Sequence, residues 1–286
     1  MTDQVSVLGL GRMGRALVGR LLDAGYQVTV WNRTPGRADE LVGRGAVEAP
    51  TVGAAVAAAA VVMTSLTGDD AVREVLLPAG RRLDELSSVV IDCSTVSPQL
   101  SGELAAQYGE QFLACPIAGA PAAVADGRAL LMLAGPRPAR DRVDAVLDAI
   151  SGSRLELGEE PRRAAGLKLL NNYLLLSEVA LLAEVASTAR AAGFSTEELS
   201  RMLPKLPVVA PGVANRVEGV LGHDHAPMFT VDLAVKDLAA AARYAAESAS
   251  RLGLADSVLD LYRRTAELGL GGHDISAVVE TLAENP

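Results

Sequence analysis

Three glycines near the amino terminus constrain the fold of this chain more than any other feature. The apolar run Val5–Leu8 leads into Gly9, Gly11 and Gly14, which fit the pattern Gly-x-Gly-x-x-Gly, and a helical pattern follows. The first glycine permits a tight turn, the second lets backbone amides approach a pyrophosphate, and the third lets helix and strand pack closely. Unpaired N–H groups and the dipole at the helix amino terminus then favour phosphates. We therefore predict a dinucleotide-binding loop, rather than a tight turn without a ligand, at Gly9, Leu10, Gly11, Arg12, Met13 and Gly14.

The first part of the chain alternates short apolar runs with helical patterns. Strands are predicted at Val5–Leu8, Gln27–Trp31, Val61–Leu66, Val89–Asp92 and Leu130–Ala134. The helices between them are predicted at Arg12–Ala24, Ala54–Ala60, Pro98–Tyr108 and Ala139–Ile150. This alternation indicates βαβ units and a largely parallel sheet. We therefore expect an α/β Rossmann amino-terminal domain over residues 1–160, with a linker at Gly158–Arg163.

The strand pattern stops after this linker, and the rest of the chain is predicted to be helical. Ala164–Ala192 has the pattern of one long helix that is apolar on nearly every face, which is typical of a buried helix. Gly193 is the expected C-cap of that helix, and Ser195 with Glu198 marks the start of the next one. Residues 161–286 are therefore expected to form an all-α carboxy-terminal domain. Its further helices are predicted at Thr196–Leu203, Val231–Arg251 and Leu254–Leu268.

The end of the second predicted strand bears on the choice between NAD(H) and NADP(H). An NAD-binding site usually has an acidic residue there, which accepts a hydrogen bond from the ribose 2′-hydroxyl. Here Asn32 takes that position, and Arg33 and Thr34 follow. An uncharged amide, a guanidinium and a hydroxyl suit a 2′-phosphate, which a carboxylate repels and an arginine binds through two hydrogen bonds. These residues favour NADP(H); the alternative is that Arg33 is a solvated loop arginine.

One lysine lies in an unusual place. The chain has three lysines, Lys168, Lys205 and Lys236, and the first lies inside the long apolar helix. A buried ammonium is unfavourable unless it is partnered, and burial lowers the pKa of a lysine toward the range useful for general acid–base chemistry. Asn172 lies four residues further on and shares its face of the helix, and Asn171 lies three further on. This predicts a proton donor beside neutral groups that hold it or a substrate oxygen; the alternative is a lysine that extends to the surface.

Charge and composition argue against several other functions. The net charge of −9 is unlike that of a general nucleic-acid binder. The two cysteines, Cys93 and Cys115, have no disulfide or metal-ligand spacing, so we expect small buried hydrophobic residues in a reducing cytoplasm. The apolar stretch Leu169–Leu182 is interrupted by polar residues and is too short to span a bilayer. Because the first strand begins by Gln4 or Val5, no signal peptide is expected.

Two histidines suggest a metal site. His223 and His225 flank Asp224 in a polar loop ahead of Pro227. The sequence has no further cysteine or glutamate cluster at ligand spacing, and we therefore expect no bound metal.

Motifs along nearly the whole chain occur in a specific order. They are Gly9–Gly14, Trp31–Thr34, Asp92–Pro98, Pro116–Ala120 continuing to Gly127, Gly166–Asn172 and Lys236–Leu238. Together they resemble the β-hydroxyacid dehydrogenase family, which includes 3-hydroxyisobutyrate dehydrogenase and glyoxylate/succinic semialdehyde reductases. The resemblance implies an NADP-binding Rossmann domain at residues 1–160. It implies an all-α substrate and dimerisation domain of the 6-phosphogluconate dehydrogenase type at residues 161–286.

The resemblance also implies roles for individual residues. In similar proteins the residue matching Lys168 is the catalytic acid/base, and the residue matching Asn172 positions the substrate. The resemblance implies that Ser94 and Thr95 lie near the nicotinamide and that Ser94 and Asn171 contact the substrate. Further contacts with the cofactor are implied for Leu66, Thr95 and Lys236.

One stretch departs from the family pattern. The substrate loop of the family usually reads Asp-Ala-Pro-Val-Ser-Gly-Gly, with the serine hydroxyl and the following amides binding a carboxylate. Here Ala118 replaces the serine and Ala120 the second glycine, while Gly119 remains. Backbone N–H groups at Gly119 and Ala120 still suit an anion, but losing a hydrogen bond to a charged group removes roughly 1.5–3 kcal/mol. The change favours a larger, less acidic or non-acid carbonyl substrate over a plain small β-hydroxyacid.

The expected activity is therefore hydride transfer between NADP(H) and a small carbonyl or hydroxy compound, with Lys168 as the acid or base. Two alternatives remain open. An imine reductase shares the cofactor half and the Trp31–Thr34 stretch, but typically has Asp or Tyr in place of the lysine. A dinucleotide-binding protein without catalytic activity is the other. The long apolar helix also indicates a homodimer that buries it, as the resemblance implies.

Overall fold

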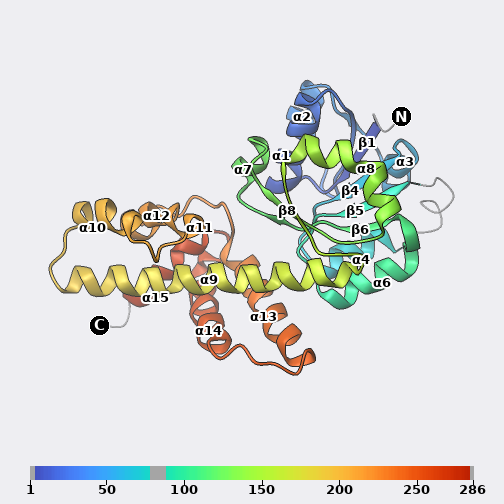
Figure 1. The fold of residues 1–286 in the computed structure, drawn as a ribbon. Helices are drawn as coiled ribbons and strands as arrows, with labels where there is room; N and C mark the ends of the chain where they lie inside the picture. Colours follow the sequence, from blue (N-terminus) through green and yellow to red (C-terminus); the bar gives the residue numbers. More distant parts are fainter. Residues whose placement is uncertain (1–3, 78–87, 284–286) are drawn as a thin grey trace. The chain divides into compact units, whose positions relative to one another are not determined.

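The chain forms two compact units. The computed structural model describes residues 4–77 and 88–283. The units are Met1–Lys168 and Leu169–Pro286. In the described part of the chain the first unit combines strands and helices, and the second contains helices and turns (Figure 1).

The division between the units lies within a helix. The long helix α9 spans Pro161–Ala191, whereas the sequence suggests a domain boundary at residue 160. The first turns of α9 belong to the first unit because Ala164 and Ala165 are buried in its core. A helix that continues through a linker in this way leaves no break in periodicity at the boundary.

Six parallel strands form the main sheet of the first unit, in the order β3-β2-β1-β4-β5-β6 (Figure 1). From β1 the chain continues through β2 and β3 on one side of the sheet. It then crosses over, and β4, β5 and β6 follow on the other side of β1. This arrangement confirms the predicted Rossmann fold. The strands are β1 (Gln4–Leu8), β2 (Gln27–Trp31), β3 (Val47–Glu48), β4 (Val61–Thr64), β5 (Val89–Asp92) and β6 (Phe112–Ala114).

Helices cover both faces of this sheet. On β1, Val5 and Val7 pack in one core with residues of α1 (Arg12–Asp23) and α8 (Arg137–Ile150). Leu8 points the opposite way, into a second core, because successive side chains of a strand alternate between faces. Burial on both faces explains why the central strands read as continuous apolar runs in the sequence.

Three strands lie in a second, smaller sheet. β7 (Ile117–Ala118) is antiparallel to β8 (Leu130–Leu133), and β9 (Ser153–Glu156) is parallel to β8. Of these, the sequence predicts β8 alone, and it also misses β3 and β6 in the main sheet. β3 and β7 have two residues each, and β9 is largely exposed and carries Arg154 and Glu156. Such segments are too short or too polar to give a recognisable strand pattern.

The remaining helices of the first unit vary in how clearly the sequence marks them. The sequence predicts α6 with both bounds. In the structure Ser97 Oγ accepts a hydrogen bond from the Leu100 N–H at 3.1 Å, and Pro98 takes the first helical position, as expected for a helix start. α2, α4 and α7 are not predicted. The helices are α2 (Asp39–Gly43), α3 (Val52–Ala57), α4 (Asp69–Leu76), α6 (Pro98–Tyr108) and α7 (Pro121–Ala125).

The second unit follows the predicted long helix. The structure confirms the end of α9, where Gly193 has a φ of +96°, and the start of the next helix, where Ser195 and Glu198 form a capping box. The shorter helices α11, α12 and α15 are not predicted. The helices after α9 are α10 (Thr196–Met202), α11 (Pro211–Ala214), α12 (Val217–Gly222), α13 (Val231–Glu247), α14 (Ala255–Thr265) and α15 (Val278–Ala283).

The helix α9 is partly buried and partly apolar on its outside. Over the described residues, it is the one helix long and apolar enough to cross a membrane by length and composition, and half of its most apolar window is buried. A core helix of a soluble protein meets the same criterion. Leu174, Leu181 and Val185 are exposed on it by 59%, 52% and 51%. Their spacing of seven and four residues places them in one stripe along the helix.

Candidate functional site

The carboxyl ends of four neighbouring strands bring the predicted cofactor residues together. The last residues of β2, β1, β4 and β5, namely Trp31, Leu8, Thr64 and Asp92, lie in register across the sheet. The predicted residues follow immediately: Gly9–Gly14 after β1, Asn32–Thr34 after β2, Leu66 after β4, and Ser94 with Thr95 after β5. Open α/β sheets bind their ligands at this edge.

Two glycines of the loop are required by the packing of the protein itself. Gly9 has a φ of +101°, and a Cβ at this position would lie 2.3 Å from the backbone oxygen of Ser65. A Cβ at Gly14 would lie 1.9 Å from the backbone oxygen of Gly9. The start of α1 therefore packs directly on the turn, as the glycine pattern predicts.

Gly11 is required for a different reason. Apart from Gly11 and its two neighbours in the chain, no atom of the described residues lies within 4 Å of the position that a Cβ would take there. Its φ of −68° and ψ of −176° are accessible to any residue. Gly11 is exposed and precedes α1, which has no side-chain cap. Neither packing nor conformation explains this glycine, whereas close approach of a ligand to the backbone does. The loop therefore fits the pyrophosphate of a dinucleotide.

Asn32 supports the loop from the adjacent strand. Its Oδ1 accepts a hydrogen bond from the Leu10 N–H at 2.9 Å, and its Nδ2 donates to the backbone oxygen of Thr34 at 2.9 Å. Both groups of the amide are thus used within the protein. This gives Asn32 a structural role in addition to the predicted role at the ribose.

Arg33 extends into solvent beside this turn. Its Nη1 lies 3.1 Å from Glu74 Oε2 on α4, and the two side chains are 72% and 62% exposed. An ion pair between such exposed groups is weak. Thr34 is exposed next to it. A phosphate therefore has access to the guanidinium in competition with Glu74.

Ser94 connects the ends of β4 and β5. The Leu66 N–H donates to Ser94 Oγ at 2.9 Å, and the Ser94 N–H donates to Asp92 Oδ1 at 3.0 Å. Thr64 donates to the same carboxylate oxygen at 2.7 Å. Ser94 is 4% exposed, and Thr95 beside it is half-buried. These bonds fix the two predicted cofactor segments that follow β4 and β5 relative to each other.

Asp92 is a buried carboxyl at this edge to which the sequence reasoning gives no role. Burial raises the pKa of Asp92, and the hydrogen bonds from Ser94 and Thr64 counteract this in part. The sequence signal that could have identified it is an acidic residue at the end of an otherwise apolar strand. Its role in the structure is to hold Ser94 and Thr64 in place.

The predicted substrate loop lies between β7 and α7. Ala118 is half-buried and has a methyl group where the family pattern has a hydroxyl. Gly119 is exposed with a φ of +145°, and a Cβ there would lie 3.3 Å from the Cβ atoms of Ala123 and Ala129. Ala120 precedes α7, which has no side-chain cap. Glycine is thus retained where the backbone requires it, while the side-chain donor is lost.

Lys168 is buried on α9. Its exposed fraction is 9%, although Lys is almost never buried without a functional or paired environment. This burial argues against the alternative in which the side chain extends into bulk solvent.

Four polar residues of α9 and α13 form a connected group in the second unit. Asn171 Nδ2 donates to Asn172 Oδ1 at 3.1 Å, and Asn172 Nδ2 donates to Asp237 Oδ2 at 2.7 Å. Lys236 Nζ lies 2.8 Å from Asp237 Oδ1. We call these residues the amide–carboxylate network. The structure thus joins three predicted site residues, Asn171, Asn172 and Lys236.

Asp237, which links the members of this network, is a residue that the sequence reasoning missed. It is 2% exposed and directly follows Lys236 in the Lys236–Leu238 motif. A buried carboxylate needs polar partners; here the Asn172 amide donates to Oδ2 and the Lys236 ammonium forms an ion pair with Oδ1. Its partner Asn172 lies 65 positions earlier, so no local pattern indicates the pair.

The cysteines and histidines have different outcomes. Cys93 and Cys115 are free and lie in the hydrophobic core, as expected. Their mutual hydrogen bond and burial raise the pKa of the Cys93 thiol well above its usual range. By contrast, the sequence has no glutamate at ligand spacing from His223 and His225, but the fold brings Glu280 on α15 against both.

Comparisons with known proteins cover almost the whole chain. Residues 4–158 match the family model of the NAD binding domain of 6-phosphogluconate dehydrogenase. Residues 163–282 match the model described as the NAD-binding domain of NADP-dependent 3-hydroxyisobutyrate dehydrogenase.

Relatives and solved structures agree with these matches. The chain is 30% identical to an uncharacterised oxidoreductase of Bacillus subtilis, covering 98% of this chain and 99% of the relative. It is 27% identical to glyoxylate/succinic semialdehyde reductase 1 of Arabidopsis thaliana, covering 98% of each. The crystal structure of a 3-hydroxyisobutyrate dehydrogenase from Salmonella typhimurium is similar with a TM-score of 0.87 and 25% identity. It covers 97% of this chain and 99% of that one.

The matches span both units, and they contain the motifs that carry the glycine loop, the buried lysine and the amide–carboxylate network. The chain therefore belongs to the β-hydroxyacid dehydrogenase family and is an NAD(P)-dependent oxidoreductase of the β-hydroxyacid type.

Proposed function

We propose that the protein transfers a hydride between NADP(H) and a small carbonyl or hydroxy compound of the β-hydroxyacid or semialdehyde type, with Lys168 as general acid and base. The observation that carries the proposal is a lysine only 9% exposed on an apolar helix. A buried amine on a helix can donate or accept a proton at a fixed position. Membership of an oxidoreductase family supplies the reaction type.

The cofactor half of the proposal rests on the edge of the Rossmann sheet. Gly11 leaves room at the start of α1 for the pyrophosphate, and the exposed Arg33 and Thr34 suit a 2′-phosphate. The bound nicotinamide supplies or accepts the hydride. We assign Leu66 and Thr95 to the surroundings of the nicotinamide, and Lys236 to a further contact with the cofactor.

The protein supplies the proton and the orientation of the substrate. Reduction of a carbonyl to a hydroxyl group requires a proton at the oxygen, which Lys168 Nζ donates; in the oxidative direction the same amine accepts it. Asn172 orients the substrate, and Asp237 holds the Asn172 amide in a fixed position. Ser94 and Asn171 complete the proposed substrate contacts.

The substrate class follows from the loop at Ala118–Ala120. Without a serine hydroxyl, binding of a carboxylate depends on the backbone N–H groups of Gly119 and Ala120, which weakens the grip on a small acid. A relative named for glyoxylate and succinic semialdehyde supports an aldehyde as the oxidised substrate. We therefore propose that larger, less acidic or non-acid aldehydes are reduced better than small acids such as glyoxylate.

The test of the mechanism uses two lysine variants. Lys168→Met should lower kcat by about 10²–10⁴-fold, the usual range for loss of a general acid, while the Kd for NADPH stays unchanged. Lys205→Met is the matched control, because Lys205 is exposed, and it should keep full turnover. Full turnover of Lys168→Met with the best substrate would contradict the proposal.

The two alternative functions are separated by a substrate panel. NADPH oxidation is measured with semialdehydes, glyoxylate, 2-oxo acids and cyclic imines. Turnover confined to the imines would identify an imine reductase, against which the lysine at position 168 counts. NADPH binding without turnover of any compound would favour a dinucleotide-binding protein without activity.

We further propose that the protein is a cytoplasmic homodimer that binds neither nucleic acid nor a membrane. The exposed stripe of Leu174, Leu181 and Val185 on α9 supports burial against a second copy. Leu181→Glu should shift the sedimentation coefficient from that of a dimer to that of a monomer. An unchanged coefficient would remove α9 from the interface.

A further inference from the structure

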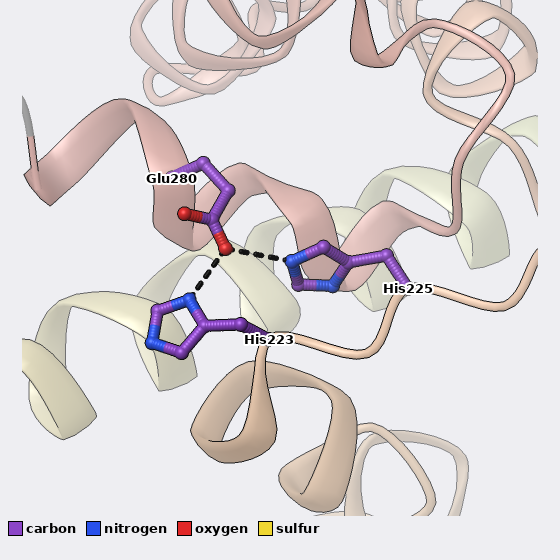
Figure 2. A group of neighbouring side chains, drawn as sticks. All are labelled: His223, His225 and Glu280. Atoms are coloured by element: carbon purple, nitrogen blue, oxygen red, sulfur yellow. Dashed lines mark hydrogen bonds and ion pairs between the residues drawn. The ribbon is translucent and has the colours of Figure 1, made fainter.

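Two histidines and a glutamate converge on one point in the second unit (Figure 2). His223 Nδ1 lies 2.5 Å and His225 Nε2 lies 2.8 Å from the same oxygen, Glu280 Oε1. The three possible ligand atoms all lie within 4.8 Å of one another. His223 is the C-cap of α12, His225 lies two residues further on in the following loop, and Glu280 lies on α15, so two separate segments supply the group.

The backbone and a hydrogen bond hold the two imidazole rings in place. His223 adopts a left-handed conformation with a φ of 56° and a ψ of 26°, which is uncommon for residues other than glycine. His225 is 8% exposed, and its Nδ1 lies 2.9 Å from Ser276 Oγ. In the metal-free protein His225 Nε2–H donates to Glu280; with the proton on Nδ1 instead, His225 donates to Ser276 and its Nε2 lone pair is free to bind an ion. Such a second hydrogen bond is typical of histidines that bind metals.

We propose that His223 Nδ1, His225 Nε2 and a carboxylate oxygen of Glu280 bind a divalent transition-metal ion, with Zn²⁺ as the representative ion. Two imidazoles and a carboxylate are a common ligand set for Zn²⁺ sites that keep a further position for water. The group lines a surface hollow of about 860 Å³, which leaves room for that water. The site is separate from the proposed hydride-transfer site, because the two share no residue.

The charge of the group is suited to a cation. Burial raises the pKa of the Glu280 carboxyl, but hydrogen bonds from His225 and His223 outweigh this effect and leave the pKa below its usual range. Glu280 is therefore an anionic ligand at neutral pH. Two neutral imidazoles and one carboxylate leave a divalent ion with one net positive charge, which the adjacent solvent can hydrate.

One neighbour opposes metal binding and provides a distinctive test. Arg190 Nη1 lies 3.0 Å from His223 Nε2 and donates to it, which places the His223 proton on Nδ1 in the metal-free protein. To bind a metal through Nδ1, His223 must move this proton to Nε2 or release it. Arg190 must then turn away from a ring that no longer accepts its hydrogen bond. Removing the guanidinium should therefore strengthen metal binding.

Binding is measured on tag-free full-length protein, first treated with EDTA and then titrated with ZnCl₂ in a calorimeter. The proposal expects one saturable site per chain and a Tm that rises with Zn²⁺ concentration, because the ion binds only the folded arrangement. Co²⁺ in place of Zn²⁺ should give visible d–d absorption bands. Absence of saturable Zn²⁺ binding to the wild-type chain would overturn the proposal.

Variants identify the ligands. Glu280→Gln and His223→Asn should each weaken Zn²⁺ binding by more than about 100-fold, the upper end of the effect of losing only an outer hydrogen bond to a metal ligand. Asn tolerates the left-handed backbone, so His223→Asn retains the end of α12. Arg190→Gln should bind Zn²⁺ more tightly than the wild type. His225→Gln is a further variant if it folds. If it does not, His223→Asn and Glu280→Gln still test the proposal, because neither side chain is fully buried.

The third histidine of the chain is the control. His273 is exposed and lines the same hollow, but it does not belong to the converging group. His273→Gln should leave the Zn²⁺ affinity unchanged. Equal loss of binding in His273→Gln and Glu280→Gln, or full binding by Glu280→Gln, would overturn the assignment.

Discussion

The glycine loop of the first unit and the amide–carboxylate network of the second unit belong to the same proposed activity, but they are built in opposite ways. The loop lies within Gly9–Gly14, and its geometry follows from the absence of side chains at Gly9 and Gly14. The network depends on the contact between Asn172 and Asp237, which are 65 positions apart. One is local and steric, and the other is long-range and electrostatic.

This difference determines how each region should respond to substitution. In the loop, an added methyl group would overlap backbone atoms at Gly9 and Gly14 but not at Gly11. Substitutions there should therefore either strongly destabilise the fold or leave its stability nearly unchanged. In the network, removal of one member leaves a buried polar partner without its hydrogen bond, which costs about 1–3 kcal/mol. The following variants test this contrast, beginning with the one expected to have the largest effect.

Gly14→Ala is expected to be the most disruptive substitution. Its Cβ would lie 1.9 Å from the backbone oxygen of Gly9, so α1 must move away from the turn. We expect a loss of at least about 3 kcal/mol in the free energy of unfolding, the upper part of the range for overpacking, and no measurable NADPH binding. Urea denaturation and NADPH fluorescence check both results.

Gly11→Ala is the matched control in the same loop. Because the new Cβ would contact no described residue beyond its chain neighbours within 4 Å, the free energy of unfolding should change by no more than about 0.5 kcal/mol. NADPH binding should nevertheless weaken by roughly tenfold or more, since the methyl group occupies space assigned to the pyrophosphate. An unchanged Kd would show that the glycine does not mark a ligand contact.

Asn172→Ala tests the network. Asp237 would lose a hydrogen bond to its buried carboxylate, and we expect a loss of about 1.5–3 kcal/mol in the free energy of unfolding. Asn171→Ala removes only a bond between two amides, and about 1 kcal/mol or less is expected. Equal effects of the two substitutions in urea denaturation would mean that the carboxylate does not depend on Asn172.

Arg33→Gln tests cofactor choice at the exposed end of the glycine-loop region. We expect kcat/KM for NADPH to fall about tenfold, within the range for a hydrogen bond between charged groups, while the value for NADH stays constant. Glu74→Gln should have the opposite, smaller effect, because it removes the carboxylate that competes for the guanidinium. A parallel fall with both cofactors would contradict a contact with the 2′-phosphate.

The pH dependence of stability should distinguish Asp92 in the first unit. Its pKa is raised by burial in the folded protein, so its contribution to stability is fully present below the unfolded pKa of about 3.9. That contribution is lost as the pH rises through the folded pKa. Stability of the wild type relative to Asp92→Asn should therefore fall with rising pH. A difference that is constant in urea denaturation at pH 4 to 8, or that increases with pH, would refute the burial argument.

Much of the fold and part of the site follow from local patterns. The sequence predicts β2, β5 and α6 with both bounds, the course of α9, and the caps at Gly193 and Ser195. It also predicts the glycine loop, since turn, strand and helix stand next to one another in the chain. These features depend on backbone sterics and on the periodicity of burial, which neighbouring residues determine.

Tertiary structure decides which distant residues meet. The pairing of Asn172 with Asp237, the bonds from Thr64 and Ser94 to Asp92, and the approach of Glu280 to the two histidines all join separate elements. The small second sheet is another case, because its strands are too short or too polar to be recognised alone. The sequence by itself determined the local units of this protein and their order. Packing decided the partners of its buried charges, because such a group is stabilised by whichever donors the fold brings within reach.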